Sequence, residues 1–154
     1  MRIGLISDTH GLLRPEARAA LRGVDHIIHA GDIGSAALLA ALEDIAPVDA
    51  VRGNNDGGAW AASIPETLEL QFDEARVYVI HDLALLDIDP AERGFRVVIA
   101  GHSHKPFARE TAGVLYVNPG SAGPRRFKLP ISLGQLHVAG RQVHAELTTL
   151  EISR

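Results

Sequence analysis

The sequence contains no cysteine. Disulfide bonds, thiolate metal sites and cysteine nucleophiles are therefore excluded, whereas sites built from histidine and carboxylate side chains are not. Long apolar runs are also missing, because no stretch approaches the ~20 residues that a membrane helix needs. Met1 and Arg2 lead directly into an expected strand, without a separate apolar leader. We therefore expect a cytoplasmic protein with no membrane-spanning segment.

The chain lacks an excess of positive charge. It has 15 Lys and Arg against 19 Asp and Glu, a formal net charge of −4. Nucleic-acid binding calls for a basic face, so the composition argues against a nucleic-acid partner and leaves only a local basic patch open. Hydrophobic residues make up 46% and charged residues 22% of the 154 residues, which is typical of one globular domain. We predict a single domain over residues 1–154, without repeats or linkers.

The first third of the chain alternates between strand and helix patterns. Apolar runs and helical spacing predict strands at 3–6, 26–30 and 48–51, with helices at 14–22 and 35–45. A β-α-β-α-β order favours a parallel sheet with crossover helices. In such sheets, ligands bind outside the carboxyl ends of the strands.

Strand patterns dominate the rest of the chain, and the later ones are expected to pair antiparallel. The predicted strands cover residues 67–72, 76–80, 96–100, 107–111, 114–118, 131–138 and 142–152. The stretch 83–93 is ambiguous, because Pro90 limits any helix there.

Oxygen and nitrogen donors follow five of these apolar runs. They are Asp8, His10, Asp32, Asn54, His81, His102 and His104. If the run 3–6 is a strand, its alternation points Asp8 and His10 to the same side. A single zinc site needs only three or four donors. The larger set suits two cations that share a bridging carboxylate, ~3.5–4 Å apart, as in phosphoester hydrolysis.

The donor types limit the choice of metal. Imidazole and carboxylate ligands without thiolate favour Mn, Fe, Zn, Ni or Co over Mg or Ca. Two divalent cations with two aspartates leave a charge of about +2, which suits a phosphate ester and a hydroxide. The residues therefore predict two divalent transition-metal ions and a small phosphoester substrate.

The order and spacing of six short blocks resemble those of the calcineurin-like metallophosphoesterase superfamily, most closely its small single-domain bacterial and archaeal phosphodiesterase branch. The blocks are Asp8-Thr9-His10, Gly31-Asp32, Gly53-Asn54-Asn55-Asp56, His81, Gly101-His102-Ser103-His104 and Asn118-Pro119-Gly120-Ser121. The resemblance implies an α/β fold of two mixed β-sheets packed face to face in a sandwich, flanked by helices. It also implies a dimetal-dependent phosphodiesterase that attacks phosphorus with a metal-bridging hydroxide.

The resemblance also assigns the donors to two metals, with manganese the favoured ion. Asp8, His10 and His104 would hold the first metal, and Asn54, His81 and His102 the second. Asp32 would bridge the two, and Asp32, Asn54 and His81 would be catalytic.

Two positions depart from the family pattern. Asn55 stands where large relatives have a histidine that protonates the leaving group, and where small relatives often have cysteine. Asparagine cannot donate a proton as an acid. Asp82 follows His81, where the family usually has glycine. These two positions bear on substrate preference and on rate.

Other residues have two interpretations. Asn55 and Arg125 are candidate substrate contacts, although Arg125 also fits a solvated loop charge. Trp60 is expected to pack rather than to line the site. Four histidines in or beside strand patterns are expected to be structural: His26, His29, His137 and His144.

The alternative function is a scaffold or protein-binding subunit of the same fold with little or no catalysis, since a fold does not fix a function. The intact donor set argues against a scaffold. A nucleotide-binding regulator that hydrolyses slowly stays open, as does a homo-oligomer.

Overall fold

The computed structural model describes residues 1–152 and forms two five-stranded sheets over that range. The first sheet has the order β10-β9-β1-β2-β3, with bounds Gln142–Thr149, Ser132–Ala139, Arg2–Ile6, His26–His29 and Val48–Ala50. The second has the order β4-β5-β6-β8-β7, with bounds Thr67–Phe72, Ala75–Ile80, Val97–Ile99, Val114–Asn118 and Phe107–Thr111. Two α-helices, α1 (Pro15–Ala20) and α2 (Ala36–Glu43), and one 3-10 helix, η1 (Leu83–Leu85), complete the elements over these residues.

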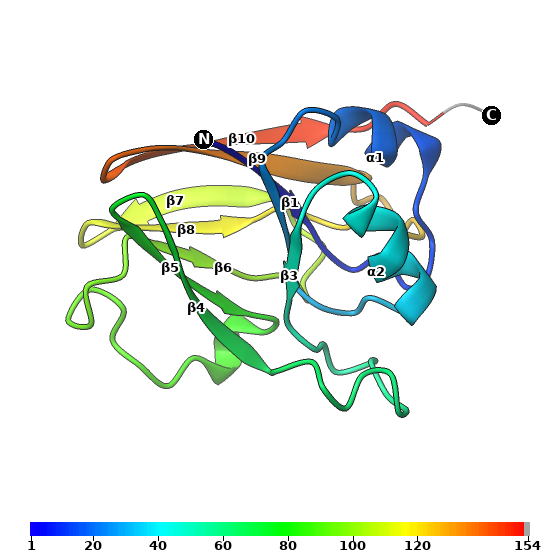
Figure 1. Ribbon diagram of the computed structural model, residues 1–154, viewed down its shortest axis with the longest axis horizontal. Coiled ribbons are helices and arrows are strands. Elements are labelled where there is room, and N and C mark those ends of the chain that lie inside the picture. The colour runs from blue at the N-terminus through cyan, green and yellow to red at the C-terminus, as the bar shows by residue number, and fades with distance from the viewer. Residues whose placement is uncertain (153–154) are drawn as a thin grey trace.

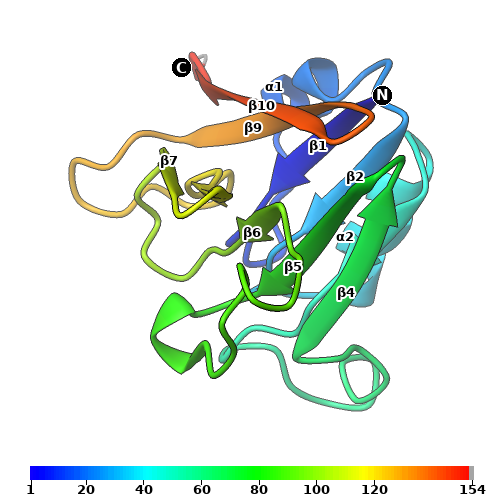
Figure 2. The same cartoon turned by 90° about the vertical axis from the view of Figure 1, so that its left-hand side faces the viewer.

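Both sheets are mixed, as predicted. In the first sheet β1, β2 and β3 run parallel, while β9 runs antiparallel to both β1 and β10. In the second sheet β5, β6 and β8 run parallel, and the outer strands β4 and β7 run antiparallel to their neighbours. The sheets pack against each other, and α1 and α2 lie on the side of the first sheet away from β4–β8 (Figures 1 and 2).

The core is layered as the sheets require. Aliphatic side chains from both sheets meet between them, for example Leu5 and Ile28 from the first sheet and Val79 and Ile99 from the second. The other face of the first sheet packs on the helices: Ile6 and Ile27 lie in one cluster with Ala17, Leu21, Leu38 and Leu42. The outer face of the second sheet buries Tyr78 and Val98 with Phe95, from the β5–β6 connection.

The predicted elements agree with these bounds to within a few residues. Ser35 caps α2, because its hydroxyl accepts a hydrogen bond from Leu38 N at 3.3 Å. The ambiguous stretch 83–93 contains only η1, which begins where the Asp82 carboxylate accepts from Ala84 N at 3.0 Å. The last strand ends at Thr149 rather than at residue 152, and the bond from Leu150 N to Ile131 O is one further contact in the same register.

No helix within residues 1–152 combines the length and the apolar character that a membrane crossing would need.

Candidate metal centre

The first two donors lie beyond the strand that precedes them. β1 ends at Ile6, and Asp8 and His10 have φ values of +54° and +48°. Strand alternation therefore does not orient them, and that part of the sequence interpretation was wrong. Their turn is held instead by the loop after β2: Asp8 N donates to Gly31 O and His10 N donates to Asp32 O, both at 2.9 Å.

The left-handed conformation recurs across the site. Asp32, His102 and His104 also have positive φ, between +55° and +70°. Such values are uncommon for residues other than glycine, and they cluster where the surrounding structure holds a functional side chain in place. The donors are thus displayed by tight turns at the strand ends rather than by the strands themselves.

Two glycines let these turns approach closely. A Cβ on Gly31 would lie 2.5 Å from His81 Nδ1, and one on Gly53 would lie 2.2 Å from Asp32 Oδ1. Heavy atoms cannot be that close, so any other residue would push a donor out of position. The glycines that precede Asp32 and Asn54 in the sequence blocks therefore have a packing reason.

The side chains converge into two overlapping groups. Asp8, His10 and His104 form one, and Asp8, Asp32 and His81 form the other, each with one ligand atom per residue within 4.8 Å of the rest. Asp8 Oδ1 lies 3.5 Å from His104 Nε2 and 3.9 Å from His81 Nε2. Asp32 Oδ2 lies 3.8 Å from His10 Nε2 and 3.4 Å from His81 Nε2. Both carboxylates thus contact donors assigned to each of the two metals.

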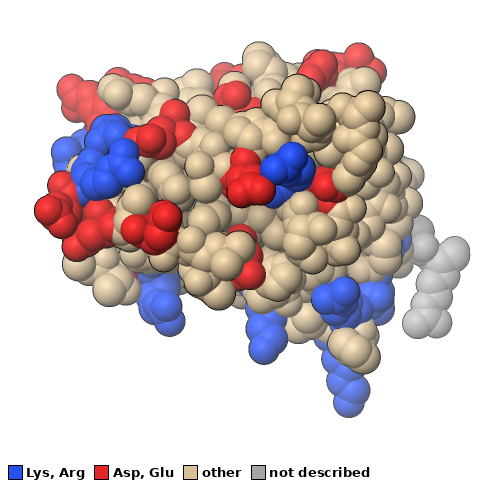
Figure 3. Space-filling model, turned by 90° about the horizontal axis from the view of Figure 1, so that it is seen from below, with Lys and Arg blue, Asp and Glu red and all other residues tan. Residues whose placement is uncertain are grey.

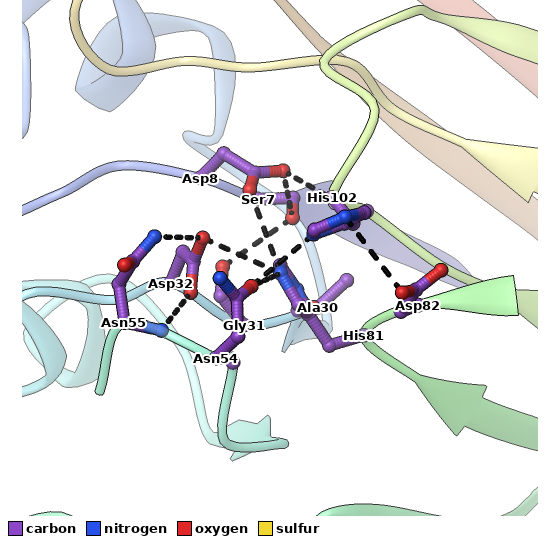
Figure 4. A network of polar contacts seen from close by, with 12 residues as sticks. Ser7, Asp8, Ala30, Gly31, Asp32, Asn54, Asn55, His81, Asp82 and His102 are labelled. Atoms are coloured by element: carbon purple, nitrogen blue, oxygen red, sulfur yellow. Dashed lines mark hydrogen bonds and ion pairs between the residues drawn. The ribbon is translucent and has the colours of Figure 1, made fainter. Parts of the chain in front are cut away.

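The remaining two donors join on the His81 side. Asn54 Oδ1 lies 3.0 Å from His81 Nε2 and 3.2 Å from His102 Nδ1. Figure 4 shows Asp8, Asp32, Asn54, His81 and His102 pointing toward one another from different turns. The structure therefore brings all seven predicted donors into one cluster, while their role as metal ligands stays a prediction.

Burial and mutual contacts shift the pKa values of these groups. Burial raises the pKa of Asp8, although the Ser7 hydroxyl, which donates to Oδ2 at 2.7 Å, opposes it. Burial would also raise the pKa of Asp32, but hydrogen bonds from His81 and Asn55 outweigh it and hold this pKa well below its usual range. These hydrogen bonds therefore favour the anionic form of Asp32.

The pKa values of two imidazoles, those of His81 and His104, shift in opposite directions. Burial would lower the pKa of His81, but the Asp32 carboxylate outweighs it, so this pKa is raised. Burial lowers the pKa of His104, and the Arg126 guanidinium adds to that shift. The cluster therefore combines two carboxylates whose pKa values shift in opposite directions with two imidazoles whose pKa values also shift in opposite directions.

The donor set fits cations. His81 Nδ1 lies 2.7 Å from Ala30 O, a carbonyl that can only accept, so Nδ1 carries a proton. In the neutral ring, Nε2 then presents its lone pair to the Asp32 carboxylate, an arrangement that a proton or a cation between them relieves. Asp8 Oδ1 is buried and has no hydrogen-bond partner within residues 1–152. Metal-ligating histidines commonly donate their other N–H to a carbonyl in this way.

One supporting carboxylate was not singled out from the sequence. Asp56 is buried and accepts from three backbone groups after β2 and β3: Ile33 N and Gly53 N at 2.9 Å, and Gly34 N at 3.0 Å. It clamps together the turns that carry Asp32 and Asn54. Asp56 stands in the Gly53–Asp56 block, but a sequence alone does not distinguish a ligand from a carboxylate that binds backbone.

The four histidines expected to be structural lie outside the two donor groups. His29 is fully buried, and Gly31 N donates to its Nδ1 at 3.1 Å. Its Nε2 therefore carries the proton and lies 2.9 Å from Thr9 Oγ1. His26 Nε2 bonds to Asp49 at 2.7 Å, while His137 and His144 pair across β9 and β10.

The buried imidazole of His29 should contribute to the pH dependence of the free energy of unfolding. Burial lowers its pKa from 6.5 to about 3. Between these values the unfolded chain binds a proton that the folded one does not, so stability falls as the pH drops below about 6.5, by up to ~1.4 kcal/mol per pH unit. We expect urea unfolding of His29→Gln to show a shallower loss of stability than wild type between pH 6 and pH 4.

His144→Gln is the matched control, because its imidazole is 72% exposed. This variant should keep the wild-type slope. Equal slopes for wild type and His29→Gln would show that the buried imidazole does not resist protonation.

The substrate-contact candidates also lie at this cluster. Asn55 donates to Asp32 twice, from its backbone N to Oδ1 at 2.9 Å and from Nδ2 to Oδ2 at 3.0 Å. Arg125 lines a cavity of about 400 Å³ together with His10 and His104. Trp60 packs against the cluster that contains α1 and α2, which agrees with a packing role.

Comparison with known proteins identifies the class to which this fold and cluster belong. The sequence-family model described as calcineurin-like phosphoesterase superfamily domain matches residues 1–141. The chain therefore belongs to this phosphoesterase family, and the fold is a metallophosphoesterase sandwich.

Individual relatives in sequence agree with this family membership. The chain is 38% identical to a probable metallophosphoesterase of Methanothermobacter thermautotrophicus, over 96% of this chain and 91% of that protein. It is 31% identical to a phosphodiesterase of Methanocaldococcus jannaschii, over 78% of this chain and 83% of that protein. The relatives in sequence are thus named as phosphoesterases.

Solved structures show the same fold. An archaeal phosphodiesterase superposes with a TM-score of 0.78 at 26% identity, covering 96% of this chain and all of its own. Vacuolar protein sorting 29 from Cryptosporidium parvum gives a TM-score of 0.84 at 21% identity, covering 97% and 91% of the two chains. The second likeness, at that identity, concerns the fold alone.

Proposed function

We propose that this phosphoesterase is a dimetal phosphodiesterase. The observation that carries the proposal is the pair of overlapping donor groups, in which Asp8 is common to both and Asp32 contacts an imidazole of each. Two divalent cations bound there would polarise a phosphoryl oxygen and make water a stronger acid. The relatives named as phosphodiesterases support the same substrate class.

Different residues of the chain would bind the cations, contact the phosphate and orient Asp32. Asp8, His10 and His104 would hold one cation, and Asn54, His81 and His102 the other, with Asp32 between them. Arg125 lines the cavity beside His10 and His104, where its guanidinium would neutralise a phosphoryl oxygen. Asn55 fixes the orientation of Asp32 through two hydrogen bonds and supplies no acid to the leaving group.

The scaffold alternative draws support from the resemblance in fold to vacuolar protein sorting 29. A binding subunit, however, gains nothing from burying Asp8 Oδ1 without a hydrogen-bond partner, since burial of an unsatisfied polar atom is costly. We propose a small phosphoester as substrate rather than nucleic acid. On the face seen from below, the Lys and Arg side chains lie in separate groups with other residues between them and form no continuous basic tract (Figure 3).

Metal content tests the dimetal proposal. After removal of metals with a chelator and dialysis against manganese, we expect about two ions per chain by elemental analysis, with hydrolysis of bis(4-nitrophenyl) phosphate appearing as they bind. Iron, zinc, nickel and cobalt would be tested in parallel. A stoichiometry well below one with every metal would contradict the dimetal centre, and two bound metals without hydrolysis of any phosphoester would favour the scaffold.

A further inference from the structure

Two cavities border the donor cluster, one beside each group of donors. One, of about 400 Å³, is lined by the imidazoles of His10 and His104 and by the loop 124–127. The other, of about 350 Å³, is lined by Asn54 and His81 and by residues of η1 and its surroundings. A phosphodiester has two ester arms, so a phosphate bound at the cluster would direct one arm toward each cavity.

The two cavities carry opposite charge. The cavity beside His10 contains Arg125 and Arg126, and no carboxylate is among the described residues that line it. The cavity beside His81 contains Glu66, Asp82 and Asp87, against one cation, Arg52, which pairs with Glu66 at 2.8 Å. An anionic arm is therefore attracted to the first cavity and repelled from the second.

Each cavity also presents an apolar side chain to solvent. Phe127 is 89% exposed in the basic cavity and Leu85 is 71% exposed in the acidic one, the two highest values among the large apolar residues that the structure describes. Neither side chain contributes to the core at that exposure. An exposed aromatic ring beside guanidinium groups is the arrangement on which nucleic-acid bases and other planar rings stack.

We propose that Arg126 and Phe127 form a subsite for an ester arm that carries a planar ring and a second anionic group, as a nucleotide does, while the acidic cavity receives an uncharged or cationic arm. Phe127 stacks on the ring and Arg126 pairs with the additional anion. The inference rests on the proposed phosphodiesterase function, because the bound phosphate sets the direction of both arms. It assigns the enzyme an asymmetric phosphodiester as substrate.

A pair of chromogenic esters tests the role of Arg126. Thymidine 5'-(4-nitrophenyl phosphate) and its 3'-phosphorylated derivative both release nitrophenolate and differ only in the extra phosphate. We expect wild type to favour the phosphorylated ester by roughly fivefold in kcat/KM, the size of an exposed ion pair. Arg126→Ala should bring that ratio close to one.

Arg141→Ala is the matched control. It removes the same charge from the β9–β10 turn. Because β9 runs antiparallel to β1, this turn lies at the end of the first sheet opposite to the donor cluster. This variant should keep the wild-type ratio. A wild-type ratio near one, or a preference that survives in Arg126→Ala, would overturn the assignment of Arg126.

The ring subsite needs a second pair of measurements. Phe127→Ala should lower kcat/KM for the thymidine ester by roughly fivefold relative to methyl 4-nitrophenyl phosphate, which has no base to stack. Phe127→Tyr keeps an aromatic ring and should behave as wild type. Equal losses on both esters in Phe127→Ala would show that the ring only supports the loop, and would overturn the stacking role.

Binding of thymidine 3',5'-bisphosphate, measured by calorimetry on the manganese-loaded protein, separates this inference from the proposed function. If neither ester is hydrolysed, the phosphodiesterase proposal fails. Calorimetry then decides the subsite alone: binding that weakens in Arg126→Ala and Phe127→Ala supports it, and absent or unchanged binding overturns it.

Discussion

Asp32→Asn should lose more than about a hundredfold in hydrolysis of bis(4-nitrophenyl) phosphate and should fail to bind two metals. The Asp32 carboxylate lies between His10 and His81, at 3.8 and 3.4 Å, so it would contact both cations of the proposed centre. The same substitution removes one of the charges that would offset the cations. His104→Ala removes one terminal imidazole and should leave the other donor group complete. Its losses in metal content and rate should therefore be smaller.

Asp8→Asn is the informative comparison, because it makes the same change of charge at the residue common to both donor groups. Metal content and hydrolysis rate would be measured for the three variants together, alongside circular dichroism to confirm folding. If Asp32→Asn holds two metals with wild-type affinity, Asp32 is not the bridge. If Asp8→Asn loses both metals while Asp32→Asn keeps one, the bridging role belongs to Asp8.

The second large effect concerns the leaving group. General acid catalysis typically contributes 10²–10⁴-fold, and most when the departing oxygen is a poor leaving group. Asn55 cannot supply that proton, and its side-chain amide is already committed to Asp32 Oδ2 at 3.0 Å. We therefore expect clear turnover of nitrophenyl diesters and turnover of alkyl diesters that is weaker by roughly two to four orders of magnitude.

A plot of log rate against leaving-group pKa measures this effect for wild type, Asn55→His and Asn55→Ala. The wild-type slope should be steep. Asn55→His should flatten it by helping the alkyl esters, whereas Asn55→Ala, which loses only the bond to Asp32, should lower all rates and keep the slope. A shallow wild-type slope that neither substitution changes would mean that another residue gives the proton.

The location of the site could be predicted from the sequence because it follows from the order of elements. Polar residues after parallel strands lie at one edge of the sheet, and the structure places Asp8, Asp32 and Asn54 there. The manner in which the side chains are presented could not be predicted. Asp8 and His10 adopt left-handed turns beyond β1, and their orientation depends on hydrogen bonds to the loop around Gly31.

The supporting contacts were equally hidden from the sequence. Asp56 differs from Asp32 only in what surrounds it, namely the backbone N–H groups of Ile33, Gly34 and Gly53 rather than imidazoles. The division of charge between the two cavities was hidden too, since loop 124–127 and the carboxylates near η1 lie far apart in the chain. Local patterns identify candidate donors, whereas long-range packing decides which of them come together in one cluster.

The donors come from turns of both sheets: Asp8, Asp32 and Asn54 follow strands of the first, while His81, His102 and His104 follow strands of the second. A cation held by this set would therefore be coordinated by residues of both sheets and would crosslink them at one edge of the sandwich. Ions that bind the folded chain and not the unfolded one raise the free energy of unfolding in proportion to the logarithm of their concentration, once that exceeds the dissociation constant. The centre that would hydrolyse the ester would then also stabilise the contact between the two sheets. A chelator would lower the hydrolytic activity and the free energy of unfolding together.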